Sequence, residues 1–275
     1  MTLPPRTTTK FLVRRAANTS RAASSGAEPV CAGNGAILPA ARAAASPKTT
    51  RAARISQTLS LLRSRTVVPS DCAIRPARPG DESGAYYVCL KTGDHGADAE
   101  HLYADDPDAL GRIFVGPYLA FERELSLILE DDEGICGYAL GALDSRSFFE
   151  RYEREWRPDL CRRFAEPSGD SRLWTPAQHV HHSYHHPDYF CPEPYAQFPS
   201  HLHIDLLPRA QGRGYGRQLI DRLEATLRDR GSPGVHLGLS ARNMRAFGFY
   251  RRLGFQELTR TGSAGEVCVY MGKRL

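Results

Sequence analysis

The sequence predicts a mixed α/β domain in which a central, mostly antiparallel sheet carries helices on both faces. Residues 201–207 alternate apolar and polar side chains, as a half-buried strand does. A glycine-rich turn at 211–216 leads from this strand into a helix with leucine and isoleucine along one side. An apolar strand at 235–239 and a helix at 243–253 follow. Strands and helices therefore alternate where the sequence signal is strongest.

The flanking segments supply the other expected elements. Short strands are predicted at 73–77, 125–129 and 135–140, and an acidic turn joins the last two as a hairpin. Helices are predicted at 83–91, 107–121 and 151–164, and the final strands at 255–258 and 266–271. The Pro-, His- and Tyr-rich stretch 174–200 is too irregular for a regular element, so we expect a loop within an insertion at about 144–200.

Length and composition limit the class of protein. The chain has 275 residues, of which 41% are apolar and 24% charged, close to the average of soluble globular proteins. No stretch reaches about 18 apolar residues, so no transmembrane helix is expected. The seven cysteines are scattered and never in C-x-x-C spacing, which favours a reducing compartment with most of them as small core residues.

Residues 1–71 are predicted to precede the folded domain, which spans 72–275. The first 70 residues hold eleven of the 36 basic residues and one of the 31 acidic ones, which leaves the remainder with a net charge of −5. Nucleic-acid binding by the main domain is therefore not expected. The Arg- and Ser-rich segment fits a mitochondrial or plastid transit peptide. The alternative, which we favour, is a disordered basic tail, or a start codon placed too early in the gene, on a cytoplasmic protein.

Three glycines at alternate positions, Gly212, Gly214 and Gly216, separate the 201–207 strand from its helix. Without side chains, the backbone N–H groups of such a turn can converge on an anion, and the helix N-terminus adds partial positive charge. Arg213 and Arg217 can add charge-assisted contacts. The turn is neither a P-loop nor a dinucleotide fingerprint, yet it predicts a phosphate or diphosphate site. The alternative is a flexible turn whose glycines allow tight packing.

Asn243 and Tyr250 stand seven residues apart on the last predicted helix and therefore share a face. Such a face could hold one extended ligand at two points. A tyrosine there also fits an ordinary core residue whose hydroxyl finds a partner at the rim.

These two motifs together resemble the GNAT superfamily of acetyl-CoA-dependent N-acetyltransferases. The family loop reads Gln/Arg-x-x-Gly-x-Gly/Ala, which Gln211, Gly214 and Gly216 match. The family's later element has Asn, then an aromatic–Tyr pair, then Gly-Phe, which Asn243, Phe249-Tyr250 and Gly254-Phe255 match. The segment 198–208 further resembles bacterial relatives of the acetyltransferase-like C-terminal domain of O-GlcNAcase, although the basic tail has no counterpart there.

The resemblance implies acetyl-CoA as cosubstrate and a splayed cleft between the strands at 201–207 and 235–239. Backbone groups of 204–207 would pair with the pantetheine arm and polarise the thioester carbonyl. The amides of 211–216 would bind the pyrophosphate, Asn243 would hold a pantetheine amide, and Tyr250 would protonate the departing thiolate. The implied cofactor-binding residues are Ile204, Asp205, Leu206, Leu207, Gln211, Gly212, Arg213, Gly214, Tyr215, Gly216, Arg217, Asn243, Phe247 and Tyr250.

The chemistry of acyl transfer to an amine agrees with these assignments. It needs a neutral nucleophile, a polarised carbonyl and a proton for the leaving group, which a tyrosine with an ordinary pKa of about 10 can supply. Asp205 is the first candidate for the base that deprotonates the amine, followed by His203 and His201, because these alternate positions share one face of the strand. The alternative for Asp205 is a surface or loop-anchoring carboxylate.

Seven of the ten histidines lie within 179–203, which raises the question of a metal site. Their spacing fits neither a His-Glu-x-x-His helix nor a Cys/His finger. We therefore predict no metal there, and leave a lid over the acceptor pocket and a solvated loop as alternatives.

The sequence thus predicts an N-acetyltransferase that moves an acetyl group from acetyl-CoA to a primary amine, on a small molecule or a protein lysine, by direct attack in a ternary complex. We expect a monomer or homodimer, with no nucleic acid and no membrane as partner. The rivals are a GNAT enzyme that uses another acyl-CoA and a catalytically silent acyl-CoA-fold module that binds a protein or peptide.

Overall fold

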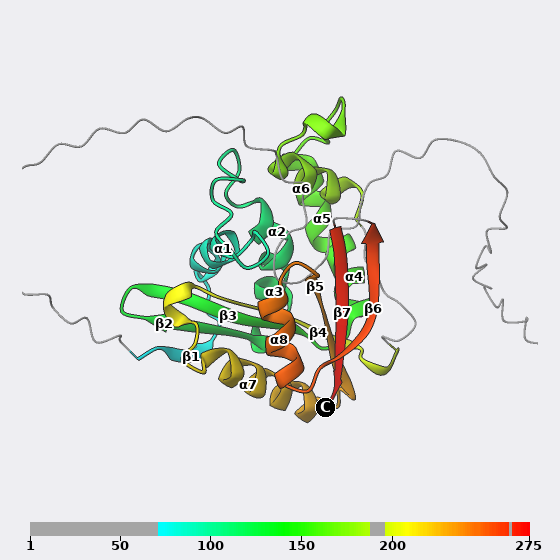
Figure 1. Cartoon of the computed structure of the whole chain (residues 1–275). Coiled ribbons are helices and arrows are strands. Elements are labelled where there is room, and N and C mark those ends of the chain that lie inside the picture. The colour runs from blue at the N-terminus through cyan, green and yellow to red at the C-terminus, as the bar shows by residue number, and fades with distance from the viewer. Residues whose placement is uncertain (1–70, 188–195, 264–265) are drawn as a thin grey trace, which may run out of the picture.

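The computed structural model describes residues 71–187, 196–263 and 266–275 (Figure 1). Except for Asp71, the predicted tail at 1–71 lies outside the described residues. The strands are β1 (Ala73–Pro76), β2 (Ser126–Asp131), β3 (Gly134–Ala142), β4 (Ser200–Leu206), β5 (Gly234–Ser240), β6 (Gln256–Ser263) and β7 (Glu266–Arg274). The helices are α1 (Glu82–Lys91), α2 (Ala109–Phe114), α3 (Gly116–Phe121), α4 (Ser145–Arg151), α5 (Arg157–Arg163), α6 (Pro176–His185), α7 (Tyr215–Asp229) and α8 (Met244–Arg252).

All the predicted strands are present in one sheet of order β1-β2-β3-β4-β5-β7-β6. Every neighbouring pair is antiparallel except β4 and β5, which pair in parallel. The β2–β3 hairpin turns at Asp132 and Glu133, and Gly134 then takes a positive φ of 108°, a conformation that glycine adopts without strain. The expected mixed, mostly antiparallel sheet is confirmed.

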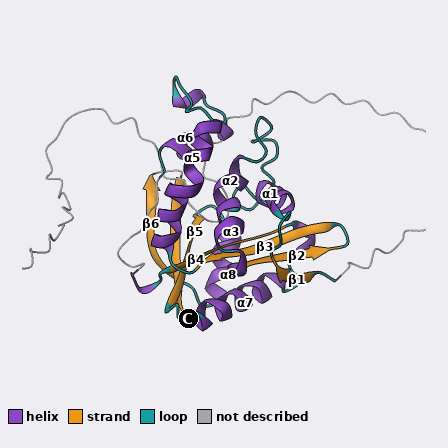
Figure 2. Cartoon of the chain, turned by 180° about the vertical axis from the view of Figure 1, so that it is seen from behind, coloured by secondary structure: helices purple, strands orange, loops and turns teal. Residues whose placement is uncertain are grey.

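Helices cover both faces of the sheet, as predicted. Helices α1 and α3 pack against β3 from one side, and α7 packs against β2, β3 and β4 from the other. Seen from either side, α1–α3 lie above β2–β4 and α7 lies below them, and α5 and α6 lie at the top of the molecule (Figures 1 and 2). Helix α4 lies behind β6 and β7 in the view of Figure 1. Leu219, Ile220, Leu223 and Leu227 form the buried stripe of α7, at the spacing the sequence predicted.

Three predictions for the middle of the chain need correction. The helix expected at 107–121 is divided into α2 and α3, because Pro117 lacks an N–H and cannot continue a helix through Val115. The helix expected at 151–164 begins earlier, with α4, and runs through a π-helical turn at Tyr152–Trp156 into α5.

The stretch 174–200 is not a loop throughout, because α6 lies within it. Thr175 and Gln178 form a reciprocal capping box at its start, and Pro176 occupies the first turn. Ala177, Val180 and Tyr184 are buried at helical spacing. The start signal was present in the sequence, but the many histidines concealed the short apolar stripe.

The core is continuous from α1 to β7 and includes Tyr138, Tyr184 and Tyr250, each less than 2% exposed. The cysteine expectation is only partly correct. Cys72, Cys89, Cys136 and Cys161 carry free thiols, whereas Cys268 is disulfide-bonded, which the sequence did not predict. Cys31 and Cys191 lie outside the described residues. Within the described ranges, no helix is both long and apolar enough to span a bilayer.

Candidate active site

The sheet is split between β4 and β5. The two strands pair at only two positions, Ser200 with Val235 and His201 with His236, although β4 continues to Leu206 and β5 to Ser240. Figure 1 shows the consequence: β1–β4 run across the view, β5–β7 stand nearly upright, and α8 lies where the two groups part. Parallel strands that separate leave backbone groups on their facing edges for another partner.

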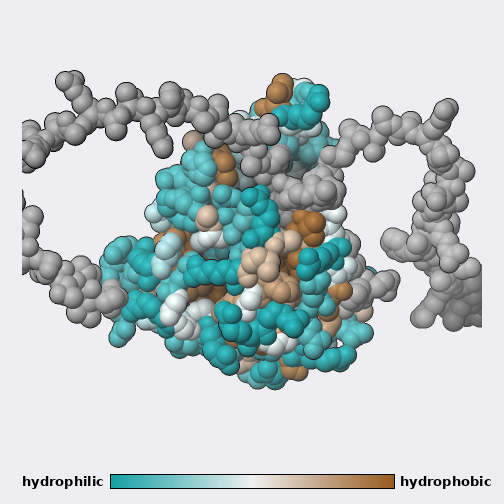
Figure 3. Space-filling model, in the orientation of Figure 1, coloured by the Kyte–Doolittle hydropathy of each residue, from teal (hydrophilic) through white to brown (hydrophobic). Residues whose placement is uncertain are grey.

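A cavity of about 650 Å³ opens at this split. A volume of this size suits a small-molecule or cofactor ligand. The face shown in Figure 3 is mostly hydrophilic, with a hydrophobic patch near the upper end of α8. Met244, the first residue of α8, is 67% exposed. The lining residues are Thr92, His95, Gly96, Ala97, Ile204, Asp205, Leu206, Ala210, Gln211, Gly212, Gly214, Gly216, Arg217, Arg242, Asn243, Met244, Arg245, Ala246, Phe249 and Arg252.

The glycine turn forms one end of the cavity and the start of α7. Gly212 and Gly214 have φ values of 75° and 85°, in the left-handed region that favours glycine. Gly214 is the N-cap of the 15-residue helix α7 and offers no side-chain cap for the N–H groups of the first turn. Gly214, Gly216 and Arg217 all line the cavity. The end of α7 thus presents backbone donors, the helix dipole and one guanidinium to a ligand.

Gln211 fixes the turn to the end of β4. Its Nε2 donates a hydrogen bond of 2.6 Å to the carbonyl oxygen of Leu206. The N–H of Leu207 donates to Cys136 on β3 at 2.8 Å, so by strand alternation the backbone groups of Leu206 face the opposite edge, toward the split. The Gln211 side chain therefore holds the glycine turn at 211–216 against the strand edge that the pantetheine arm is predicted to follow.

Asn243 is the N-cap of α8 and lines the opposite side of the cavity. Its Oδ1 accepts from the N–H of Ala246 at 3.0 Å, so the side chain is held in place. A Cβ built on Gly96 would lie 2.9 Å from the Asn243 Nδ2, and Gly96 has a φ of 95°. The loop 92–97 therefore approaches Asn243 closely across the cleft, and only glycine fits at the point of contact.

Asp205 lies on the wall of the cavity with a raised pKa. Its Oδ2 accepts a hydrogen bond of 2.6 Å from the hydroxyl of Tyr138, its register partner on β3. Burial raises the pKa of the Asp205 carboxyl to about 7, and the hydrogen bond from Tyr138 opposes that rise. A carboxylate that titrates near neutrality and faces a cavity is suited to proton transfer. The carboxyl is not a surface group, but the Thr92 side chain also interacts with it, so the alternative of a loop-anchoring carboxylate stays open.

His201 and His203 share the β4 face with Asp205, as predicted, but both are buried. The Tyr118 hydroxyl lies 2.7 Å from the Nε2 of His201 and 2.8 Å from the Nε2 of His203. Ser145 Oγ donates to a backbone carbonyl and lies 2.8 Å from the His201 Nδ1, so that nitrogen carries the hydrogen. It follows that Tyr118 donates to His201 and accepts from His203.

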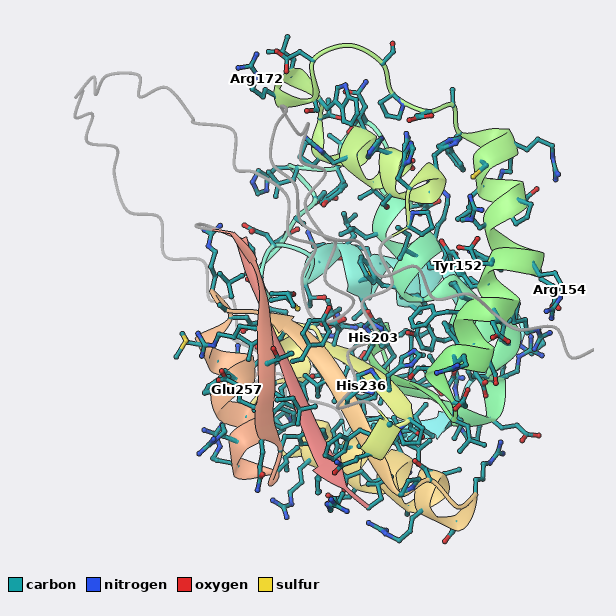
Figure 4. The ribbon with its side chains drawn as sticks, turned by 90° about the vertical axis from the view of Figure 1, so that its right-hand side faces the viewer. Tyr152, Arg154, Arg172, His203, His236 and Glu257 are labelled. Atoms are coloured by element: carbon teal, nitrogen blue, oxygen red, sulfur yellow. The ribbon has the colours of Figure 1, made fainter. Side chains whose placement is uncertain are left out.

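Burial keeps both imidazoles neutral near pH 7. Burial lowers the pKa of His203 to about 4 and that of His201 well below its usual value, and the neighbouring histidines add to the effect. Figure 4 places His203 close to His236, whose pKa burial also lowers to about 4. Neither His201 nor His203 lines the cavity.

The cavity brings together nine of the predicted cofactor-binding or catalytic residues: Ile204, Asp205, Leu206, Gln211, Gly212, Gly214, Gly216, Arg217 and Asn243. Six others lie outside its lining: His203, Leu207, Arg213, Tyr215, Phe247 and Tyr250. Arg213 lies over the ring of Tyr215 and turns toward Cys72. Tyr250 is 1% exposed and packs against Phe249 and Phe255. The roles of all fifteen residues stay predictions.

Sequence reasoning missed two parts of the site. The loop 92–97 contributes Thr92, His95, Gly96 and Ala97, and His95 has a φ of 51°, an uncommon value for a residue that is not glycine. Around α8, Arg242, Arg245 and Arg252 add positive charge, and Phe249 packs against Gly216. The repeated arginines near Asn243 were a readable signal, whereas the loop is adjacent to them only in the folded chain.

The histidine-rich stretch is divided between two places. His179, His181, His182 and His185 lie on α6 and His186 at its end, away from His201 and His203 on β4. At the surface of α6, Glu166, His182 and His186 could hold a metal ion by their spacing. Within the described residues, Glu166 instead pairs with His186 at 2.6 Å, and none of these three side chains lines the cavity.

The fold is an open mixed sheet that splits between two parallel strands beside a glycine-capped helix, and this arrangement leaves strand edges and backbone N–H groups available to a phosphate-bearing ligand. The acetyltransferase (GNAT) family profile matches residues 94–255. The chain belongs to the GNAT acetyltransferase family, as its two motifs predicted.

Individual relatives agree with this assignment. Protein O-GlcNAcase of Rattus norvegicus and that of Mus musculus are each 29% identical over 203 residues, which cover 74% of this chain and 22% of theirs. The chain therefore spans about a fifth of the length of these curated relatives. The crystal structure of SsHAT matches with a TM-score of 0.66 and 36% identity, over 74% of this chain and 98% of that chain.

Proposed function

We propose that this protein transfers an acetyl group from acetyl-CoA to a primary amine, by direct attack of the amine within a ternary complex. The observation that carries the proposal is the split between β4 and β5, which ends at the uncapped N-terminus of α7. The unpaired edges of β4 and β5 can form hydrogen bonds along a pantetheine arm. At the end of the split, the backbone N–H groups at the start of α7 can bind a pyrophosphate. Four arginines line the cavity, against Asp205 as its single acidic lining residue. This balance suits a polyanionic cofactor.

In the proposed reaction the amine nitrogen attacks the thioester carbonyl carbon, and the carbonyl oxygen takes the negative charge. The strand edge at Leu206 supplies the hydrogen-bond donor for that oxygen. The carbon–sulfur bond then breaks, the thiolate takes a proton, and the nitrogen loses one. No covalent acyl-enzyme is required, so no cysteine is needed as nucleophile.

Asp205 is the proposed base and His203 the weaker candidate. A base works best when its pKa lies near the working pH, and the Asp205 pKa of about 7 meets that condition. The His203 pKa of about 4 makes its imidazole a poor proton acceptor at neutrality. Asp205 also lines the cavity and His203 does not.

The proposal is tested by calorimetric titration with acetyl-CoA, followed by a coupled assay of free CoA release with a panel of primary amines. We expect one equivalent of acetyl-CoA to bind and at least one amine to accelerate CoA release. Binding without release from any amine would favour the silent binding module. Tighter binding and faster turnover of a longer acyl-CoA would favour another acyl donor, and no binding would overturn the proposal.

Tyr250 is proposed as the proton donor to the leaving thiolate, on the strength of the family motif and its place one helical turn from Ala246, which lines the cavity. Tyr250→Phe is expected to lower kcat by at least about tenfold, because general acids contribute about 10²–10⁴-fold, and to leave the Kd for acetyl-CoA unchanged. The measurement is steady-state kinetics beside calorimetry. Unchanged kcat would leave Tyr250 as a packing residue against Phe255.

A further inference from the structure

Two free thiols and a carboxylate meet at the edge of the sheet, outside the cavity. The Sγ atoms of Cys72 and Cys136 lie 3.8 Å apart. One ligand atom each from Cys72, Asp131 and Cys136 lies within 4.8 Å of the other two. Cys72 precedes β1, Asp131 ends β2 and Cys136 belongs to β3, so the fold alone brings the three together.

The separation of the two sulfur atoms has the size of one edge of a metal coordination tetrahedron. With a Zn–S bond of about 2.3 Å, two thiolates on a tetrahedral ion are about 3.8 Å apart. A disulfide instead needs about 2.05 Å between the sulfurs. The two sulfur atoms therefore already have the spacing that a shared tetrahedral ion requires.

The surroundings hold the carboxylate in position. Arg209 binds both oxygens of Asp131, at 2.8 and 3.1 Å, and the Asp131 side chain is 6% exposed. A carboxylate has further lone pairs beyond those that an arginine uses, so Asp131 can also accept a metal. Hydrogen bonds of this kind to a ligating carboxylate are a regular part of metal sites.

We propose that Cys72, Asp131 and Cys136 form a binding site for a thiophilic divalent cation of the Zn²⁺ class. Two sulfur ligands select a soft or borderline ion over Mg²⁺ or Ca²⁺. Cys72 is partly exposed, so water can fill the fourth position. The step involves no redox change: each thiol gives its proton to solvent as its sulfur bonds to the ion.

The site adjoins the turn that precedes α7. The backbone N–H of Cys72 donates to the hydroxyl of Tyr215 at 3.0 Å, and Arg213 reaches toward the Cys72 sulfur at 3.9 Å. A bound ion would tie Cys72 to β3 and, through Tyr215, steady the first turn of α7. We therefore expect it to raise the thermal stability of the protein.

The reduced, metal-free full chain is titrated with Co²⁺ in the presence of a phosphine reductant. The thiolate-to-cobalt charge-transfer absorption is recorded, and the bound cobalt is then displaced with Zn²⁺. We expect one equivalent of Co²⁺ to bind and to produce a charge-transfer band. Cys72→Ser should weaken Co²⁺ binding at least about tenfold. Removing a residue that only contacts a metal ligand already costs about 10–100-fold in metal affinity, and removing a ligand itself should cost no less. Cys161→Ser, at another partly buried free thiol, should leave it unchanged.

Each other outcome overturns the site. Binding without the charge-transfer band, or binding that survives Cys72→Ser, would place the ion elsewhere. Equal loss in Cys161→Ser would show a general effect of removing a thiol, and circular dichroism establishes that each variant is folded. If Cys136→Ala binds as the parent does, the thiol pair is not the ligand. Failure of the reduced protein to bind Co²⁺, with recovery of a Cys72–Cys136 disulfide from air-oxidised protein, would make the pair a redox couple instead.

Discussion

Gly214→Glu is expected to abolish detectable binding of acetyl-CoA. The substitution places a carboxylate at the N-cap of α7, where the pyrophosphate is proposed to bind, and like charges in contact cost several kcal/mol. A loss of at least about 100-fold in affinity follows, since each 1.4 kcal/mol is about tenfold. No heavy atom lies within 4 Å of a Cβ at this position, so the side chain meets no clash in the ligand-free fold. Isothermal calorimetry measures the effect.

Gly231→Glu is a closely matched control. Gly231 follows the other end of α7, has a φ of 84° against 85° for Gly214, and also has open space around its Cβ. Both variants carry the same backbone strain and the same new charge. Only Gly214 lines the cavity. Normal acetyl-CoA binding by Gly214→Glu, or an equal loss in Gly231→Glu, would remove the diphosphate site from this turn.

Asp205→Asn is expected to lower kcat/KM by about 10²–10⁴-fold, the usual contribution of a general base. In the parent protein kcat/KM should rise with pH up to about 7, because the carboxyl must lose its proton before it can accept one from the amine. That rise should disappear in the variant. Rates for an amine of low pKa, which stays neutral across the range, separate the enzyme's titration from that of the acceptor.

The pH dependence of the free energy of unfolding tests the raised pKa of Asp205 independently of activity. The folded-state pKa of Asp205 is raised, so the folded protein holds this proton more tightly than the unfolded chain does. Its contribution to stability is therefore lost as pH rises from about 4 to about 7, and Asp205→Asn should flatten that part of the profile. Denaturant midpoints at several pH values measure it.

Tyr138→Phe is the matched control for Asp205. It keeps the carboxylate and the Thr92 side chain, and it removes the hydrogen bond from Tyr138, the larger of the two that favour the ionised form. The activity profile should then move to higher pH with its maximum largely retained. A profile in Asp205→Asn that keeps its midpoint near 7 would assign the base to another group.

Much of the site could be predicted because its chemistry depends on the backbone. Gly212, Gly214 and Gly216 indicated a turn with bare N–H groups, and the alternation in 201–207 placed Asp205 and His203 on one face. Local periodicity and turn chemistry determine such features. The sequence could not show that His203 is buried beneath Tyr118 while Asp205 reaches the cavity, because the exposure of each residue depends on which helix covers it.

The helices around the insertion were harder to predict. Residues 107–121 read as one periodic segment, and only the clash and missing donor of Pro117 divide it. In α6 the polar histidines outnumber the apolar stripe, and the helix depends on its capping box and on packing against α2 and α5.

The sequence by itself determined the family, the order of the strands along the chain, the glycine turn at 211–216 and the helix that follows it. These follow from spacing along the chain, which the backbone converts directly into local geometry. Only the tertiary structure decided the length of the split between β4 and β5, the approach of loop 92–97 to Asn243, the pKa of Asp205 and the meeting of Cys72 with Cys136. Each of these depends on contacts between segments far apart in the chain, and burial and electrostatics are set by those contacts.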